Sequence, residues 1–139
     1  IGSGNMGSAM MRGILASGKC TEDEIMASDA LAGTLTAVEK DLGIMTSMDN
    51  KIVASFADVI FLAVKPQYYE NVITGIRDVI SLDKIVVTIA PGKTLEWLQG
   101  IFGKPVKIIR TMPNTPAMVR EGMMGMCPNG HVSKEDIVW

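Results

Sequence analysis

Short runs of apolar, β-branched residues alternate along the chain with longer stretches whose apolar positions recur at helical spacing. This alternation predicts a parallel α/β sheet. The clearest strand is 59–64, which is apolar on both faces, as in a central strand covered by helices. The predicted strands are 25–28, 44–47, 59–64, 85–90, 107–112 and 122–127, and the predicted helices are 5–16, 30–42, 54–57, 66–79, 94–102 and one beginning after Ser133.

The predicted fold class is α/β, with a doubly wound, mainly parallel sheet and helices on both faces. The chain opens at Ile1, directly before a glycine-rich loop, and leaves no room for a strand ahead of that loop. The last predicted helix has barely begun when the chain ends at Trp139. We therefore expect residues 1–139 to be one domain that lacks most of its first strand and is incomplete at both ends.

Composition and charge narrow the possible functions. The chain has 139 residues, of which 47% are apolar, enough to form the core of a single globular domain. Thirteen Lys and Arg against fifteen Asp and Glu give a net charge of −2, which argues against nucleic acid or an anionic membrane as partner. No apolar run approaches the ~20 residues of a membrane span. The two cysteines, Cys20 and Cys127, lack C-x-x-C spacing, so we expect a reducing, cytoplasmic setting.

The segment from Gly2 to Gly7, GSGNMG, fits the pattern G-x-G-x-x-G. Such glycines allow a tight turn, close approach of the backbone to a pyrophosphate, and close packing of the following helix. Asp29 lies 22 residues beyond Gly7, where an acidic residue would bind the ribose hydroxyls of NAD and repel a 2′-phosphate. The alternatives are a surface turn for the glycines and a helix N-cap for Asp29.

Two further polar groups follow predicted strands. Lys65 ends the best strand, at the edge where open α/β sheets bind ligands, and could meet a phosphate or a carboxylate. Asn114 and Thr115 stand on a stiff loop between two prolines, after another strand. An exposed lysine and a plain turn are the structural alternatives.

Other catalytic motifs are excluded. Gly92-Lys93-Thr94 resembles the end of a P-loop, but the position that needs a glycine is Val87. His131 is the only histidine, so neither a metal site nor an acyl-transfer triad is expected.

Several segments together resemble the pyrroline-5-carboxylate reductases, which catalyse the last step of proline biosynthesis. The matching segments are 1–7 (IGSGNMG), 58–66 (DVIFLAVKP), 85–92 (IVVTIAPG), 109–117 (IRTMPNTPA) and 120–122 (REG). Their order and spacing match over nearly the whole chain.

The resemblance implies a Rossmann-type domain that binds NADP or NAD, followed by an all-helical domain that dimerises and completes the active site. The implied reaction is reduction of 1-pyrroline-5-carboxylate to L-proline by a homo-oligomer. The substrate would be held largely by the helical domain, so no catalytic residue is assigned within this chain. We expect the chain alone to bind dinucleotide weakly and to be inactive.

The resemblance also implies positions for the cofactor. Asp29 stands where NADP-preferring members often have a neutral residue or a following arginine, and Pro91 where alanine is usual. The choice between NADPH and NADH stays open. The implied contacts are Ile1, Gly2, Ser3, Gly4, Asn5 and Met6 at the pyrophosphate, Ser28, Asp29 and Asn50 near the adenosine ribose, Ala63, Val64, Lys65, Pro66, Ile89, Ala90 and Pro91 at the nicotinamide, and Asn114 beside the substrate.

Two alternative functions are weighed against the reductase. A 3-hydroxyacid dehydrogenase has a similar glycine loop, but the segment 112–116 (MPNTP) argues against it. A non-catalytic dinucleotide-sensing domain would also fit a chain without a complete catalytic set.

Overall fold

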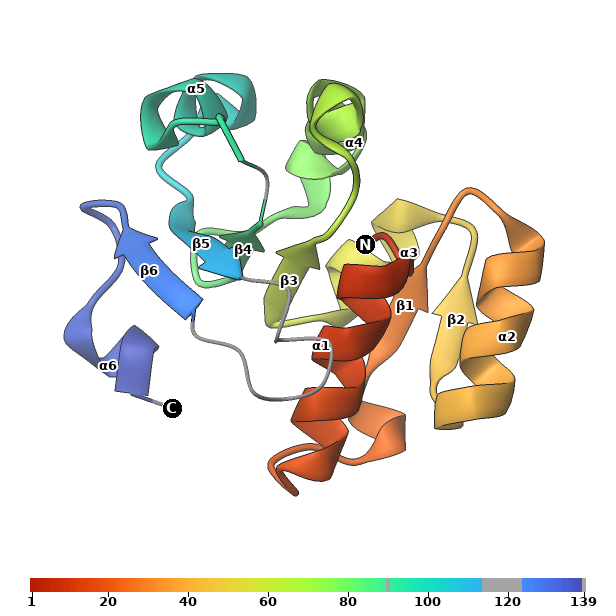
Figure 1. Ribbon diagram of the computed structural model, residues 1–139. Coiled ribbons are helices and arrows are strands. Elements are labelled where there is room, and N and C mark those ends of the chain that lie inside the picture. The colour runs from red at the N-terminus through yellow and green to blue at the C-terminus, as the bar shows by residue number, and fades with distance from the viewer. Residues whose placement is uncertain (90, 114–123, 139) are drawn as a thin grey trace.

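Strands and helices alternate along the computed structural model, which describes residues 1–89, 91–113 and 124–138 (Figure 1). The strands are β1 (Met26–Ser28), β2 (Met45–Ser47), β3 (Val59–Leu62), β4 (Ile85–Thr88), β5 (Lys107–Pro113) and β6 (Met124–Pro128). The helices are α1 (Asn5–Ala16), α2 (Ala32–Leu42), α3 (Asn50–Phe56), α4 (Tyr69–Ile76), α5 (Leu95–Phe102) and α6 (Lys134–Val138), with 3₁₀ turns at Glu22–Glu24, Pro66–Tyr68 and Arg77–Val79.

The strands form two hydrogen-bonded groups. β1 and β2 pair in parallel, and β3, β4 and β5 form a second parallel group in which Leu62, Thr88 and Arg110 lie side by side. β6 pairs antiparallel with β5. The ten residues between β5 and β6 are fewer than a parallel crossover requires, so an antiparallel return is the natural arrangement. The predicted doubly wound, mainly parallel sheet is confirmed.

Helices cover both faces of this arrangement. The buried side of β3, β4 and β5 packs against α3, α4 and α5 in the largest apolar cluster, which includes Ile60, Leu62, Ile73, Leu98 and Ile108. On the other side of the molecule, α1 and α2 pack against β1 and β2 (Figure 1). The second face of β3 is apolar too, because Val59 and Phe61 pack in a separate cluster with Ile85, Val87 and Ile109. Burial on both faces explains why the sequence of β3 is apolar at every position.

Several element boundaries differ from the predicted ones. α3 begins at Asn50 rather than at residue 54, because the Asp49 carboxylate accepts a hydrogen bond from the Lys51 amide (2.9 Å) and caps the helix. β3 ends at Leu62 and β4 at Thr88, two residues earlier than predicted in each case. The last strand ends at Pro128, one residue later than predicted, and the first two residues of the predicted strand, 122–123, lie outside the described residues.

Ile1 joins the two strand groups. Its amine donates to the Phe61 carbonyl (2.7 Å), and its carbonyl accepts from the Ala63 amide (2.8 Å). On the opposite side the Gly2 amide donates to the Ser28 carbonyl (2.8 Å). Ile1 therefore has the hydrogen bonds of a residue in a parallel strand between β1 and β3, which gives the sheet its doubly wound strand order.

A cavity of about 810 Å³ opens next to Ile1, between α1, β1 and the amino-terminal ends of β3 and β4. Its lining is largely apolar and includes Met10, Ile14, Met26 and Phe61. We call it the inter-sheet cavity. Its lining reaches Gly2, Gly7 and Ala63 at the carboxyl end of β3 and extends from there to Asp58 and Asp83, before the amino-terminal ends of β3 and β4.

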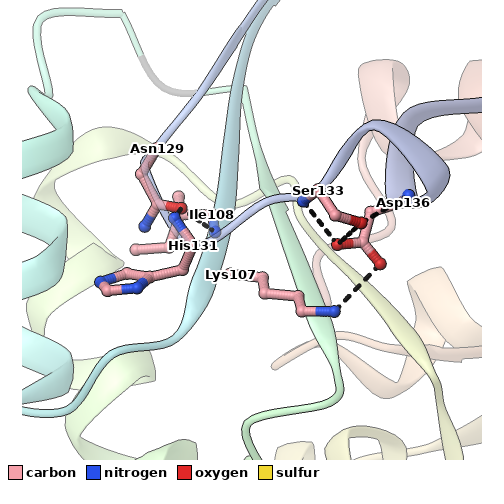
Figure 2. A network of polar contacts seen from close by, with 6 residues as sticks. All are labelled: Lys107, Ile108, Asn129, His131, Ser133 and Asp136. Atoms are coloured by element: carbon pink, nitrogen blue, oxygen red, sulfur yellow. Dashed lines mark hydrogen bonds and ion pairs between the residues drawn. The ribbon is translucent and has the colours of Figure 1, made fainter.

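The C-terminal elements are fixed to β5 by polar contacts (Figure 2). Lys107 forms an ion pair with Asp136 (3.0 Å), and the Ser133 amide donates to the same carboxylate (2.8 Å). The Ser133 bond, followed by Lys107, lowers the pKa of Asp136 from its ordinary value. The Asn129 side chain accepts from the Ile108 amide (3.3 Å). The predicted helix start at Ser133 is confirmed.

None of the helices in the described ranges has the length and the apolar composition of a membrane span.

Candidate functional site

The glycine loop is shaped by two close backbone approaches. Gly2 has φ +92°, and a Cβ there would stand 2.7 Å from the carbonyl carbon and oxygen of Ala63. A Cβ on Gly7 would stand 2.3 Å from the Gly2 carbonyl oxygen. Both contacts exclude any side chain, so these glycines let the loop pass directly over the end of β3. A Cβ on Gly4, in contrast, would meet nothing within 4 Å, so the surface above Gly4 is open.

The open surface faces the amino-terminal end of α1. Gly4 is the N-cap in an extended conformation, and it provides no side-chain cap for the helix. The first turn also contains no acidic residue. The amide groups and the positive end of the helix dipole together favour an anion at this place. The local geometry therefore supports the predicted phosphate-binding role of the glycine loop.

Asp29 links the glycine loop to the end of β1. Its Oδ2 accepts from the Ser3 amide (2.9 Å), and its Oδ1 accepts from the Leu31 amide (3.0 Å). The N-cap of α2 is Leu31, so the alternative prediction that Asp29 itself caps this helix is wrong. Because two backbone donors hold it, the carboxylate is a fixed negative charge beside the loop.

Ser28 and Asn50 complete this side of the site. The Ser28 hydroxyl, fully buried, donates to the Asn50 side-chain oxygen (2.7 Å), which ties the end of β1 to the start of α3. The Ser3 hydroxyl in turn donates to the Ser28 carbonyl (3.1 Å). The structure thus brings together the three residues expected near the adenosine ribose and places them next to the loop.

The residues expected at the nicotinamide follow β3 and β4, which are neighbours in the sheet. Ala63 is bonded to Ile1 through its amide, and Pro66 begins a 3₁₀ turn. Lys65 is exposed, and its carbonyl accepts from the Tyr68 amide (3.0 Å). Ile89 is half-buried and Pro91 is exposed. The expected contacts Ala90 and Asn114 lie outside the described residues.

Tyr69 was not singled out from the sequence, yet it joins the ends of these two strands. Its side chain is fully buried, and its hydroxyl donates to the Leu62 carbonyl (2.5 Å) and accepts from the Ile89 amide (3.2 Å). The available signal was a tyrosine on the apolar face of a helix, because a buried tyrosine hydroxyl needs a hydrogen-bond partner.

In the isolated 139-residue chain, the Ile1 amine is a buried titratable group next to the loop. Burial lowers its pKa from 8.0 to about 6, and the negative charge of Asp29 partly opposes this shift. The amine therefore loses its proton more readily than an exposed N-terminus does.

The chain is similar in sequence and in structure to known pyrroline-5-carboxylate reductases. The pyrroline-5-carboxylate reductase of Escherichia coli strain K12 is 40% identical over 136 residues, which are 98% of this chain and 51% of that protein. A solved pyrroline-5-carboxylate reductase from Coxiella burnetii matches with a TM-score of 0.93 and 33% identity, over 98% of this chain and 50% of that one. The chain spans about half the length of the curated relatives it matches.

A Plasmodium falciparum pyrroline carboxylate reductase solved with NADP bound matches with a TM-score of 0.86 and 29% identity, over 98% of this chain and 49% of that one. These matches confirm the resemblance and the Rossmann-type fold. A family model described as NADP oxidoreductase, coenzyme F420-dependent, matches residues 1–92. Since that match covers the glycine loop, β1 to β4 and more than half of the chain, the chain belongs to this family.

Proposed function

We propose that this chain is the dinucleotide-binding part of an NAD(P)H-dependent pyrroline-5-carboxylate reductase, which makes L-proline. The observation that carries the proposal is the open surface over Gly4 at the uncapped start of α1. Gly2 and Gly7 are packed too closely for any side chain, whereas a Cβ on Gly4 would meet nothing within 4 Å. That difference is expected where the middle glycine leaves space for a pyrophosphate.

Different residues of the chain would bind the different parts of the cofactor, with the two halves on opposite sides of the glycine loop. Gly2 to Met6 would line the pyrophosphate, and the donors would be the amides of Gly4, Asn5 and Met6 at the start of α1. The Gly2 and Ser3 amides are already bonded, to Ser28 and Asp29. Ser28, Asp29 and Asn50 would bind the adenosine ribose, and 63–66 with 89–91 would line the nicotinamide. When bound, NAD(P)H supplies the hydride that reduces the imine carbon of the substrate. The protein contributes position and an oriented surface.

The remaining parts of the reductase belong to a longer protein. The curated relatives are about twice as long as this chain, which supports a following domain that would hold the substrate and form the homo-oligomer. In that protein Asn114 would lie beside the substrate, and the setting would be the cytoplasm. The inter-sheet cavity supports a further strand ahead of Ile1. We expect the 139-residue chain alone to bind dinucleotide weakly and to form no proline.

The test uses the full-length protein that carries this chain. Oxidation of NADPH and of NADH is followed by absorbance, with and without 1-pyrroline-5-carboxylate, and the isolated 139-residue chain is assayed in parallel. We expect the full-length protein to oxidise NADPH or NADH only when the substrate is present, and the isolated 139-residue chain to oxidise neither. Binding of a cofactor without oxidation would replace the proposal with a dinucleotide sensor. Oxidation or reduction that depends on a 3-hydroxyacid would replace it with a dehydrogenase.

A further inference from the structure

Two neighbouring tyrosines at the start of α4 have opposite environments. The side chain of Tyr68 is 53% exposed, whereas Tyr69 is 0% exposed. Burial of a tyrosine removes its hydroxyl from water, and this is tolerated only where the hydroxyl is hydrogen-bonded. Tyr69 meets this condition through two main-chain groups on different strands, the Leu62 carbonyl and the Ile89 amide.

The register of β3 against β4 shows that these two main-chain groups would pair with each other in a regular parallel ladder. On one side of β3, the Ile1 amine donates to the Phe61 carbonyl and the Ile1 carbonyl accepts from the Ala63 amide. Polar groups alternate in direction along a strand, so the Leu62 carbonyl faces β4. Leu62 is opposite Thr88, and in a parallel ladder the carbonyl of Leu62 is then the partner of the next amide, that of Ile89.

The Tyr69 hydroxyl therefore stands between two groups that the register would pair directly. It donates to the carbonyl and accepts from the amide, so it satisfies both groups and links the ends of β3 and β4. The regular ladder stops at this point, with Leu62 and Thr88 as the last residues of the two strands. Beyond it the chain continues into 63–66 and 89–91.

We propose that Tyr69 is a positioning residue that fixes the relative position of the carboxyl ends of β3 and β4, and thereby sets the affinity for the nicotinamide half of the dinucleotide. The inference rests on the proposed function. The adenosine half would lie beyond the glycine loop, on the side of Asp29, and Tyr69 has its bonds on the other side of Ile1. Removal of the hydroxyl should therefore affect the two halves unequally.

The experiment compares Tyr69→Phe and Tyr68→Phe in the full-length protein. Each variant is titrated with NADPH and with ADP, which carries the adenosine and the diphosphate but no nicotinamide. For Tyr69→Phe we expect NADPH binding to weaken by about fivefold or more while ADP binding stays within about twofold, consistent with the loss of one bridging hydrogen-bond group. The KM of Tyr69→Phe for NADPH should rise as its affinity for NADPH falls. Tyr68→Phe should leave both ligands unchanged.

A purely structural role predicts a different result. If Tyr69→Phe weakened NADPH and ADP equally, or weakened neither, the inference would be overturned while the proposed function stood. A parent protein that binds neither ligand would overturn both. Thermal unfolding of each variant verifies that it is folded. Tyr69→Met, which also removes the hydroxyl and fills the space with a flexible apolar side chain, carries the same expectation if Tyr69→Phe does not fold.

Discussion

A methyl group at Gly7 would clash with the backbone, whereas one at Gly4 would project into open space. Alanine at Gly7 should therefore affect stability, and alanine at Gly4 should affect binding. Gly7→Ala should lower the free energy of unfolding by about 1–3 kcal/mol, because the new Cβ would stand 2.3 Å from the Gly2 carbonyl oxygen and force the backbone to shift. Gly4→Ala should change stability by less than about 1 kcal/mol. It should weaken dinucleotide binding, since its methyl group projects into the open surface. Urea unfolding and NADPH titration measure the two effects.

Gly13→Ala provides the matched control for this pair. Gly13 lies within α1, and a Cβ there would meet nothing within 4 Å. Alanine favours a helix more than glycine does, so this variant should gain about 0.5–1 kcal/mol of stability and keep the parent affinity for NADPH. If Gly4→Ala bound NADPH as tightly as Gly13→Ala, the surface above Gly4 would not be the phosphate site.

Asp29 should control the choice between the two dinucleotides. Its carboxylate is held by the Ser3 and Leu31 amides, so it cannot easily move away from a 2′-phosphate. Asp29→Ser should therefore raise the ratio of kcat/KM for NADPH to that for NADH in the full-length protein. Asp29→Glu keeps the charge and serves as the control, with a ratio close to that of the parent. An unchanged ratio in Asp29→Ser would remove Asp29 from cofactor selection.

The loop glycines and Asp29 could be singled out from the sequence because the pattern that predicts a dinucleotide site has a fixed spacing. Tyr69 could not be recognised in the same way. Its partners are main-chain groups of Leu62 and Ile89, and only the register of β3 against β4 determines which of these groups meet. Residue type alone carries no such information.

At the scale of elements, Lys84 terminates α3 from a distant part of the chain. Its ammonium donates to the carbonyls of Ala54 (2.9 Å), Ser55 (2.9 Å) and Ala57 (2.7 Å) at the negative end of the helix. Lys84→Met should lower the free energy of unfolding by about 1–2 kcal/mol, because these carbonyls lose a charged donor. Chemical denaturation at neutral pH measures the loss.

Lys51→Met is the comparison for that variant. Lys51 is exposed in the first turn of the same helix, where a positive charge is not favoured by the helix dipole. Its replacement should change stability by no more than about 0.5 kcal/mol. Equal losses in the two variants would show that the Lys84 contacts add nothing beyond a general effect of charge.

The elements themselves were largely predictable, since strand and helix periods differ clearly in this sequence. α1 has the predicted bounds, Asn5 to Ala16. The errors occur where a boundary depends on a side chain or on pairing. α3 begins earlier because Asp49 caps it, and β4 ends at Thr88, just before the Ile89 amide meets the Tyr69 hydroxyl. Neither effect is visible in hydrophobic periodicity.

For the molecule as a whole, Ile1 is the single described residue that bonds to β3 on one side while its neighbour Gly2 bonds to the end of β1 on the other. The buried Ile1 amine has its pKa lowered from 8.0 to about 6, whereas the unfolded chain keeps the ordinary value. Between these values the unfolded state binds more protons, so the stability of the 139-residue chain should rise with pH from 6 to 8 by about 2 kcal/mol. Urea unfolding across this pH range tests the rise.

An extension ahead of Ile1 separates this charge effect from the effect of the cavity. Five apolar β-branched residues should remove the pH dependence, because the amine becomes an amide, and should also stabilise the chain at every pH by filling part of the 810 Å³ inter-sheet cavity between β1 and β3. A Gly-Ser extension of equal length should remove the pH dependence without the added stability, since it has no apolar side chains to bury. Equal stability of the two extended chains would mean that the cavity does not accept a strand. Higher stability of the apolar one alone would mean that hydrophobic burial between the two strand groups limits the stability of the present chain.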